Sequence, residues 1–215
     1  QVYKGNWREA YRLLQETDDF PEFTGRVCPA LCEKGGVLML SADAPVTVRN
    51  NEAAIIEKAF SEGYVEACPP RTRTGKRVAV IGSGPAGLAC ANQLNRKGHT
   101  VDVYEKDERI GGLLRLGIPD FKLNKNIIDR RLALLEKEGI SFICNTPVGE
   151  NKKQLASLLA DYDAVCVAIG SGEPRNLSVE GRELKGVYFA LELLKQQNRI
   201  IAGEKIAPEE LISAK

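Results

Sequence analysis

One stretch of this chain, residues 78–112, constrains its fold more than any other. A strand pattern over Lys76–Ile81 leads into it, with apolar residues at the last four positions, as in a strand buried on both faces of a parallel sheet. Glycines then follow at G-x-G-x-x-G spacing, at Gly82, Gly84 and Gly87. A helix pattern over Pro85–Lys97 comes next, and Gly98 ends it. This order predicts the first unit of a doubly wound α/β domain that binds a dinucleotide.

Each glycine of this motif has a separate physical role. Gly82 lets the chain turn sharply out of the strand, and Gly84 has no Cβ to keep a pyrophosphate away from the backbone. Gly87 lets the helix approach the sheet closely. The N-terminus of the helix presents free N–H groups and the positive end of its dipole to the phosphates. Pro85 is tolerated in the first helical turn, because its missing N–H would have no partner there.

An acidic residue lies where a dinucleotide site needs one. Thr100–Tyr104 reads as the second strand, and Glu105 follows it, 23 positions after Gly82. An acid at this spacing binds the 2′-hydroxyl of an adenosine ribose. A carboxylate there repels a 2′-phosphate, so the site is poorly suited to NADP. Because the strand, the helix and the acidic residue all occur in the expected order, a dinucleotide site is a better interpretation than a glycine-rich turn that binds no ligand.

The residues after Glu105 carry a resemblance to a known family. The segments Arg109–Arg115, Gly117–Leu123, Phe20–Pro29, Glu173–Arg175 and Gly181–Val187 resemble the small (β) subunit of NADPH-dependent glutamate synthase. Dihydropyrimidine dehydrogenase and the flavin subunits of NADH-dependent ferredoxin:NADP oxidoreductases share the pattern. The resemblance covers nearly the whole chain, and it implies that the dinucleotide is FAD.

The resemblance also implies which residues contact FAD. The pyrophosphate site would comprise Gly82, Ser83, Gly84, Pro85, Ala86 and Gly87, and Glu105 would bind the adenosine ribose. The Gly-Gly turn and the segment after it would lie against the pyrophosphate and the flavin, through Lys106, Gly111, Gly112, Leu113, Arg115, Ile118, Pro119 and Lys122. Arg115 and Lys122 could equally be ordinary surface charges. Further contacts are expected at Val148, Ala168 and Gly170, where Ile169 replaces the threonine of the family's Ala-Thr-Gly turn.

Two cysteines match part of an iron–sulfur motif. In the resembling family a run V-C-P-x-x-C-E-x-x-C supplies thiolates to [4Fe–4S] clusters, which favour such soft, anionic donors. Cys28 and Cys32 match its first two cysteines, but Gly36 stands in place of the third. Two cysteines cannot hold a [4Fe–4S] cluster unaided, so simple free thiols remain the favoured interpretation for this chain alone. Three further cysteines fall within helix or strand patterns and read as core residues: Cys90, Cys144 and Cys166.

The chain divides at a proline-rich, basic linker over Cys68–Thr74. Residues 1–73 predict a small helical domain resembling the family's iron–sulfur domain, and residues 74–215 predict the first half of an FAD-binding domain. Helices are expected over Trp7–Gln15, Asn50–Gly63, Asn124–Glu138 and Lys152–Ala160. Further strands are expected over Ile140–Cys144 and Ala164–Ile169, the last of them buried. Strand and helix thus alternate after the linker, as in a doubly wound parallel sheet.

Composition excludes several classes of partner. The 215 residues carry 30 basic and 29 acidic side chains, so no global field favours nucleic acid or an anionic membrane. No apolar run approaches the length of a membrane span, and no signal-peptide pattern opens the chain. Six cysteines without a compact framework indicate a reducing compartment, and we expect a cytoplasmic location. His99 is the only histidine and is expected to be solvated.

The resemblance implies an electron-transfer function for the complete protein. Electrons would pass from NADPH through FAD and iron–sulfur clusters to a large (α) subunit that makes glutamate from glutamine and 2-oxoglutarate. In the family the NADPH-binding domain follows the segment matching residues 212–215, so we expect this chain alone to be inactive. No acid–base residue is expected, because the flavin performs the chemistry. The alternatives are a related FAD subunit of ferredoxin:NADP oxidoreductase or dihydropyrimidine dehydrogenase type, and a non-catalytic FAD-binding fragment.

Overall fold

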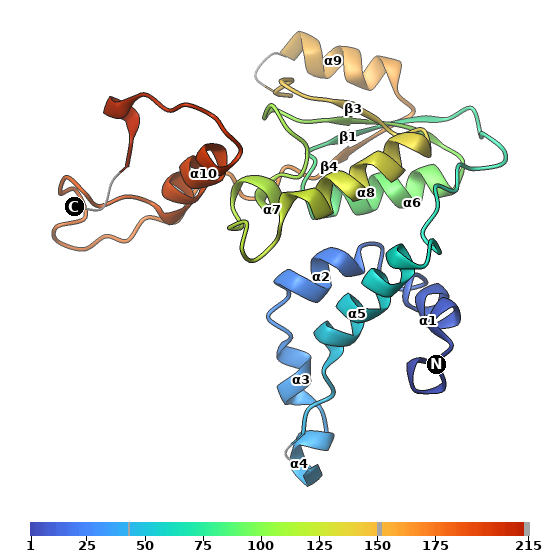
Figure 1. Cartoon of the computed structure of the whole chain (residues 1–215). Helices are drawn as coiled ribbons and strands as arrows, with labels where there is room; N and C mark the ends of the chain where they lie inside the picture. The colour runs from blue at the N-terminus through green and yellow to red at the C-terminus, as the bar shows by residue number, and fades with distance from the viewer. Residues whose placement is uncertain (43, 150–151, 213–215) are drawn as a thin grey trace. The chain divides into compact units, whose positions relative to one another are not determined.

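The computed structural model describes residues 1–42, 44–149 and 152–212, so the chain-terminal residues 213–215 lie outside it. The chain divides into two compact units, Gln1–Cys68 and Pro69–Lys215 (Figure 1). The first is helical and the second is an α/β unit built on a parallel sheet.

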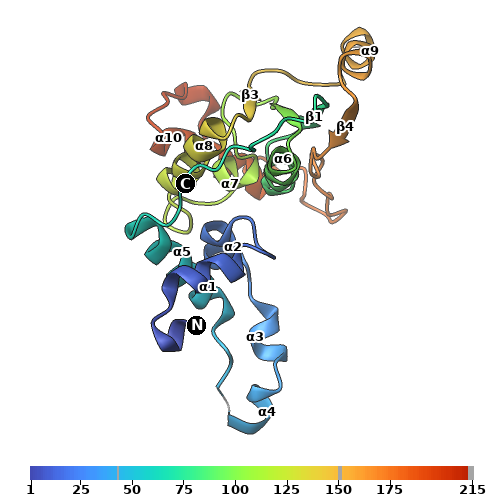
Figure 2. The same ribbon diagram turned by 90° about the vertical axis from the view of Figure 1, so that its right-hand side faces the viewer.

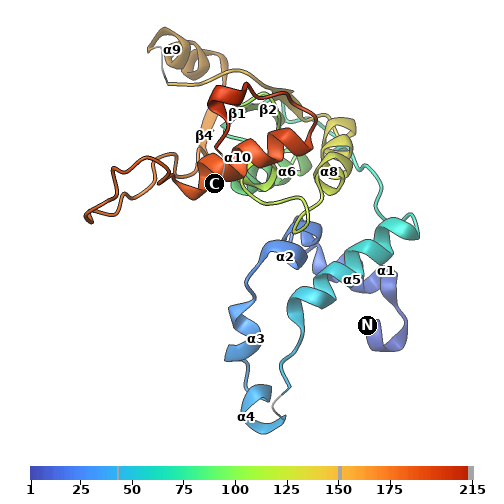
Figure 3. The same ribbon diagram turned by 60° about the vertical axis from the view of Figure 1, so that its left-hand side comes forward.

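The first unit is a set of short helices around one longer helix. Its elements are η1 (Val2–Lys4), α1 (Trp7–Leu14), α2 (Pro21–Val27), α3 (Leu31–Gly35), α4 (Leu38–Ala42) and α5 (Val48–Ser61). Helix α5 lies beside both α1 and α2 (Figure 3). A Cβ on Gly25 would lie 2.7 Å from the backbone nitrogen of Ala53, so only glycine permits this approach of α2 to α5. Phe20, Phe23 and Ile56 are buried and form the core of the unit.

The described residues of the second unit form a sheet of four parallel strands. They are β1 (Arg77–Ile81), β2 (Thr100–Tyr104), β3 (Ser141–Ile143) and β4 (Ala164–Val167), in the order β3-β2-β1-β4. In register, Ala79 of β1 lies opposite Asp102 of β2 and Val165 of β4. The predicted doubly wound parallel sheet is therefore confirmed.

Helices cover both faces of this sheet. The helices of this unit are α6 (Pro85–Arg96), α7 (Leu113–Leu116), α8 (Lys125–Lys137), α9 (Lys152–Asp161) and α10 (Ala190–Ile201), followed by η2 (Pro208–Glu210). Helices α6 and α8 lie on one face and α9 on the other (Figures 1 and 2). Leu88 and Ala91 of α6 are fully buried, and Leu158 and Tyr162 pack against Ala79 on the opposite face.

Strand β4 differs from its prediction. It ends at Val167 instead of Ile169, and it is not buried, since Val167 and Ile169 each expose 66% of their surface. Among the described residues β4 is an edge strand with β1 as its only neighbour, which an apolar run in the sequence cannot reveal. Cys90, Cys144 and Cys166 are likewise half-buried and not fully in the core.

Candidate functional site

The site begins where β1 ends. Gly82 takes φ +101°, a conformation that favours glycine, and its N–H donates to the Tyr104 carbonyl at 2.8 Å. A Cβ on Gly82 would lie 2.4 Å from the Ala168 carbonyl oxygen. The turn after β1 therefore lies in close contact with the end of β2 on one side and the end of β4 on the other.

Gly84 and Gly87 shape the turn after β1, and we call the backbone of Gly82–Gly87 the cradle. A Cβ on Gly87 would lie 1.9 Å from the Gly82 carbonyl oxygen, so α6 packs directly against the turn. A Cβ on Gly84 would meet no described atom within 4 Å. Gly84 is the N-cap of α6, and no side chain of a described residue caps this helix start. The backbone at Gly84 is thus open to an anion, with the exposed Pro85 and Ala86 forming the first turn beside it.

The Gly-Gly turn that follows β2 closes one side of this cradle. Gly112 takes φ +52° and Gly111 takes φ +128°. A Cβ on Gly112 would lie 3.0 Å from the Cα of Gly84. The fold therefore brings together two glycine segments that lie 28 residues apart, as a dinucleotide phosphate site requires.

Glu105 forms the floor of the site. Its side chain is only 4% exposed. Glu105 Oε2 accepts hydrogen bonds from the Ser83 N–H at 3.0 Å and from the Ser83 hydroxyl, and Oε1 accepts from the Asp107 N–H at 3.0 Å. The Ser83 hydroxyl oxygen accepts in turn from the Gly111 N–H at 3.0 Å. Oε1 has one described donor and can accept a second hydrogen bond, as from a ribose hydroxyl.

Arg115 is not a surface charge. It is 7% exposed, its Nε donates to the Ile110 carbonyl at 2.6 Å, and its guanidinium forms an ion pair with Asp129 at 2.5 Å. Neither Asp129 nor this carbonyl was predicted as a partner of Arg115 from the sequence. Arg115 therefore anchors the segment after the Gly-Gly turn to α8.

The other predicted FAD contacts are distributed around this centre. Lys106, Leu113 and Lys122 are exposed, and Ile118 and Pro119 are half-buried. Ala168 donates its N–H to the Ile81 carbonyl at 2.8 Å, which holds the end of β4 beside the turn, and Gly170 follows it with φ +67°. Val148 is half-buried and packs against the cluster of Ala79, Leu158 and Tyr162, on the face of the sheet that α9 covers.

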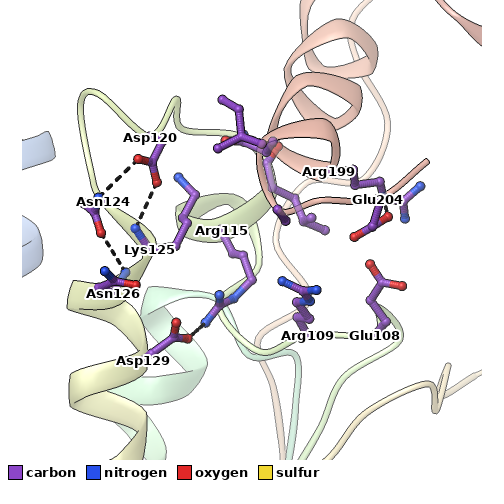
Figure 4. A pocket seen from close by; sticks show the side chains of 14 residues that line it. Glu108, Arg109, Arg115, Asp120, Asn124, Lys125, Asn126, Asp129, Arg199 and Glu204 are labelled. Carbon is purple, nitrogen blue, oxygen red and sulfur yellow. Dashed lines mark hydrogen bonds and ion pairs between the residues drawn. The ribbon is translucent and has the colours of Figure 1, made fainter. Parts of the chain in front are cut away.

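A polar pocket of about 270 Å³ lies between α7, α8, α10 and the loop after β2 (Figure 4). Its charged lining residues are Glu108, Arg109, Arg115, Asp120, Lys125, Asp129, Arg199 and Glu204. The pKa of Lys125 is lowered, mainly by burial. The negative charge of Asp120 opposes this shift, and the positive charge of Arg115 adds to it. Burial and a hydrogen bond with Glu108 raise the pKa of Glu204. Positive and negative groups are equal in number here, so the pocket shows no preference for one sign of ligand.

Cys28 and Cys32 lie in the first unit and are both exposed. The Ala30 N–H donates to Cys28 Sγ at 3.4 Å. Among the described residues no group of three or more His, Cys, Asp or Glu side chains could hold a metal ion. Two thiols do not fit the four-ligand requirement of a [4Fe–4S] cluster, so a cluster would need ligands from elsewhere.

Two family models match the chain. Residues 80–120 match an NAD(P)-binding Rossmann-like domain, and residues 1–64 match dihydropyrimidine dehydrogenase domain II, 4Fe-4S cluster. No helix in the described parts of the chain has the length and apolar character needed to cross a bilayer.

Named relatives match nearly the whole chain. The glutamate synthase (NADPH) small chain of Mycobacterium tuberculosis is 50% identical over 209 residues, 97% of this chain and 42% of the relative. The small chain of Bacillus subtilis is 45% identical, over 100% of this chain and 43% of the relative. The glutamate synthase (NADH) of Saccharomyces cerevisiae is 50% identical over 95% of this chain and 10% of the relative. The chain thus spans less than half the length of the curated relatives it matches.

A solved structure supports the fold of the second unit. FprA from Mycobacterium tuberculosis, in complex with NADPH, is 30% identical with a TM-score of 0.51, over 57% of this chain and 29% of that chain. These matches confirm the predicted resemblance and the Rossmann-like fold of the second unit.

Proposed function

Because this chain is a homologue of glutamate synthase small chains over nearly its whole length, we propose that it forms part of a flavoprotein electron-transfer subunit of that type. Its second unit would be the first half of an FAD-binding domain. The observation that carries this proposal is the open backbone at Gly84, bounded by Gly112 and by a helix start without a side-chain cap. Such a cradle fits a pyrophosphate.

The residues of this chain would bind and orient FAD. The backbone of Gly82–Gly87 would hold the pyrophosphate, and the free acceptor capacity of Glu105 would bind the adenosine ribose. The segment from Gly111 to Lys122 would lie toward the flavin, with Arg115 holding its start in place. When bound, FAD supplies two-electron hydride acceptance and one-electron release, which no side chain of this chain could supply.

Glu105 favours FAD over NADP in this cradle. Its carboxylate lies at the end of β2, where an NADP site must accept a 2′-phosphate. Glu105 is buried and accepts three hydrogen bonds, which hold its carboxylate at the position where it would repel that phosphate. NADPH would therefore bind elsewhere in the complete protein, outside this chain.

The overall reaction of the complete protein is inferred from the glutamate synthase relatives. In the complete protein, electrons from NADPH would pass through FAD and iron–sulfur clusters to a large (α) subunit that makes glutamate from glutamine and 2-oxoglutarate in the cytoplasm. Residues 1–73 would be the cluster domain, to which Cys28 and Cys32 would contribute ligands together with others. This chain alone would bind FAD without turnover.

A second candidate is a related FAD subunit serving another acceptor. The match of residues 1–64 to dihydropyrimidine dehydrogenase domain II favours this possibility. An FAD subunit of the ferredoxin:NADP oxidoreductase type would need the same pyrophosphate site at the cradle. The protein that copurifies with the complete subunit distinguishes these candidates, since a glutamine-dependent synthase partner would be found only in the first case.

FAD titration of the purified chain tests the cradle. We expect saturable binding, and we expect Gly84→Ala to weaken it at least about tenfold, because a methyl group would displace one charge-assisted hydrogen bond of about 1.5–3 kcal/mol. Gly172→Ala is the matched control, since a Cβ there also meets no described atom within 4 Å. Both variants should unfold in urea within about 1 kcal/mol of the parent. Equal FAD affinity of the parent and Gly84→Ala would refute the assignment.

A further inference from the structure

Two of the six cysteines lie against one another. Cys90 on α6 and Cys166 on β4 are 76 residues apart in sequence, yet the Cys90 thiol donates to Cys166 Sγ at 3.4 Å. Both are free thiols and half-buried. Neither is among the residues that would contact FAD, and neither belongs to the Cys28–Cys32 motif, so the proposed function gives them no role.

The backbone sets this proximity. Cys166 lies opposite Val80 in the register of β4 and β1, on the face of the sheet that α6 covers. A Cβ on Gly87 would lie 3.5 Å from the methyl group of Ala168. Gly87 and Cys90 are one helical turn apart, and Cys166 and Ala168 are two strand positions apart. The two contacts therefore align α6 along β4 and keep the backbone positions of Cys90 and Cys166 close to one another.

We propose that Cys90 and Cys166 form an intramolecular disulfide when the protein meets a low-molecular-weight disulfide such as oxidised glutathione. The Cys166 thiolate attacks the oxidant, forming a mixed disulfide and releasing one thiolate. The Cys90 thiolate then attacks Cys166 Sγ, forming the protein disulfide and releasing the second thiolate. The two cysteines lose two protons and two electrons, and the oxidant becomes two thiols. To form the bond, the two sulfurs must approach from 3.4 Å to about 2.05 Å.

The order of these steps follows from the surroundings of Cys90. Burial, together with its hydrogen bond to Cys166, raises the pKa of Cys90 to about 11. Cys90 carries the proton of the hydrogen bond to Cys166, so it is assigned as the resolving residue, and the rate of closure should increase with pH. A thiolate that is not stabilised also favours the closed disulfide over the reduced pair. The disulfide would fix α6, whose N-terminus forms the cradle, to β4.

Peptide mapping of the full chain tests the proposal. The reduced chain is incubated with excess oxidised glutathione at pH 8.5, alkylated and digested with trypsin. We expect residues 78–96 to be joined to residues 154–175, with the loss of two hydrogens. Closing this long loop should raise the thermal midpoint by about 5 °C or more. The oxidised product should bind no more than a trace of glutathione at Cys90 or Cys166, whereas the exposed Cys28, Cys32 and Cys68 should be glutathionylated.

Three variants separate this outcome from general oxidation. Cys90→Ser and Cys166→Ser should each abolish the joined peptide and the thermal shift. Cys144→Ser is the matched control, because Cys144 is also a half-buried thiol with a pKa raised by burial, and it should retain both. Joined peptides that involve other cysteines instead, or free Cys90 and Cys166 after prolonged oxidation at pH 8.5, would overturn the proposal.

Discussion

Ser83 and Glu105 are joined by two hydrogen bonds, because one carboxylate oxygen of Glu105 accepts both the N–H and the hydroxyl of Ser83. The hydroxyl oxygen accepts in turn from the Gly111 N–H. One buried serine thus connects the turn after β1, the end of β2 and the Gly-Gly turn. The geometry of the cradle depends on this connection as much as on its glycines.

Removing the Ser83 hydroxyl should loosen all three segments. We expect Ser83→Ala to lower the free energy of unfolding by about 1–3 kcal/mol, because Glu105 and the Gly111 N–H each lose a buried partner. Urea unfolding followed by circular dichroism measures this change. The exposed Ser178 supplies the control variant Ser178→Ala, which should stay within about 0.5 kcal/mol of the parent. Similar stability of the two variants would contradict the connecting role of Ser83.

Arg115 should not tolerate replacement by lysine. Arg115 reaches the Ile110 carbonyl and Asp129 through two separate nitrogens of its planar guanidinium, a geometry that the ammonium group of lysine does not reproduce. We therefore expect Arg115→Lys to cost about 1–3 kcal/mol of unfolding free energy. Asp129→Asn should cost less than about 1 kcal/mol, because the Asp129 side chain is 58% exposed. Urea unfolding of both variants tests this order. A larger loss for Asp129→Asn would show that the ion pair, and not the carbonyl contact, holds the segment.

Protonation of Glu52 should stabilise the helical unit. The Thr24 hydroxyl lies 2.7 Å from Asp18 and 2.8 Å from Glu52, but it has only one proton to donate. Burial, with the charges of Asp18 and Glu33, raises the pKa of Glu52 above 4.5. The folded state then binds more protons than the unfolded state above pH 4.5, so this contribution is present at low pH and is lost as pH rises through the folded pKa.

Glu52→Gln should therefore be stabilising at pH 7, by about 0.5 kcal/mol, a value typical of a half-exposed charge. It should also remove the loss of stability above pH 4.5. Fluorescence of Trp7, the single tryptophan, reports unfolding of this unit specifically. The exposed Glu66 gives the control Glu66→Gln, whose pH profile should follow the parent. A destabilised Glu52→Gln variant at pH 7 would reverse the expected sign.

Asn198 should control how firmly α10 is held. Its buried side chain donates to the Leu116 carbonyl at 3.0 Å, which ties α10 to α7. We expect Asn198→Ala to lower local stability by about 1 kcal/mol and to accelerate amide exchange in α10 about fivefold, with little change in β1 or β2. Gln197→Ala, on the same helix but exposed, is the control. Uniform acceleration across the sheet would indicate a global effect instead.

The sequence could predict the elements around the glycine motif because local chemistry dictates them. Gly82, Gly98 and the apolar run of β1 determine where strand and helix begin and end, and the predicted second strand matches β2. Helices α2 and α10 were not predicted. Helix α2 has only seven residues, too few for a clear periodic pattern, whereas α10 has an amphipathic pattern that was missed in the sequence. Their burial depends on contacts made after folding, such as Gly25 against Ala53 and Asn198 against Leu116.

The sequence could predict which residues form the candidate site, but not the hydrogen bonds and ion pairs that connect them. The spacing of Glu105 indicates an acid at the end of the second strand, and the structure puts it there. The spacing cannot show that Ser83 occupies one of its oxygens, because the direction of Ser83 depends on the left-handed turn at Gly82. Nor can the sequence show that Arg115 is buried, because its partners come from Ile110 and from a helix 14 residues away.

The strand order β3-β2-β1-β4 has a consequence for how such a site can change. The chain leaves β1 toward β2 and β3 on one side and returns to β4 on the other. The connections at the carboxyl ends of β1 and β4 therefore diverge, and in open α/β sheets such a reversal of strand order forms the crevice where ligands bind. Gly82 and Ala168 meet at its base. Because connectivity creates this crevice, side-chain substitutions around it can alter which nucleotide is selected while its location on the sheet stays the same.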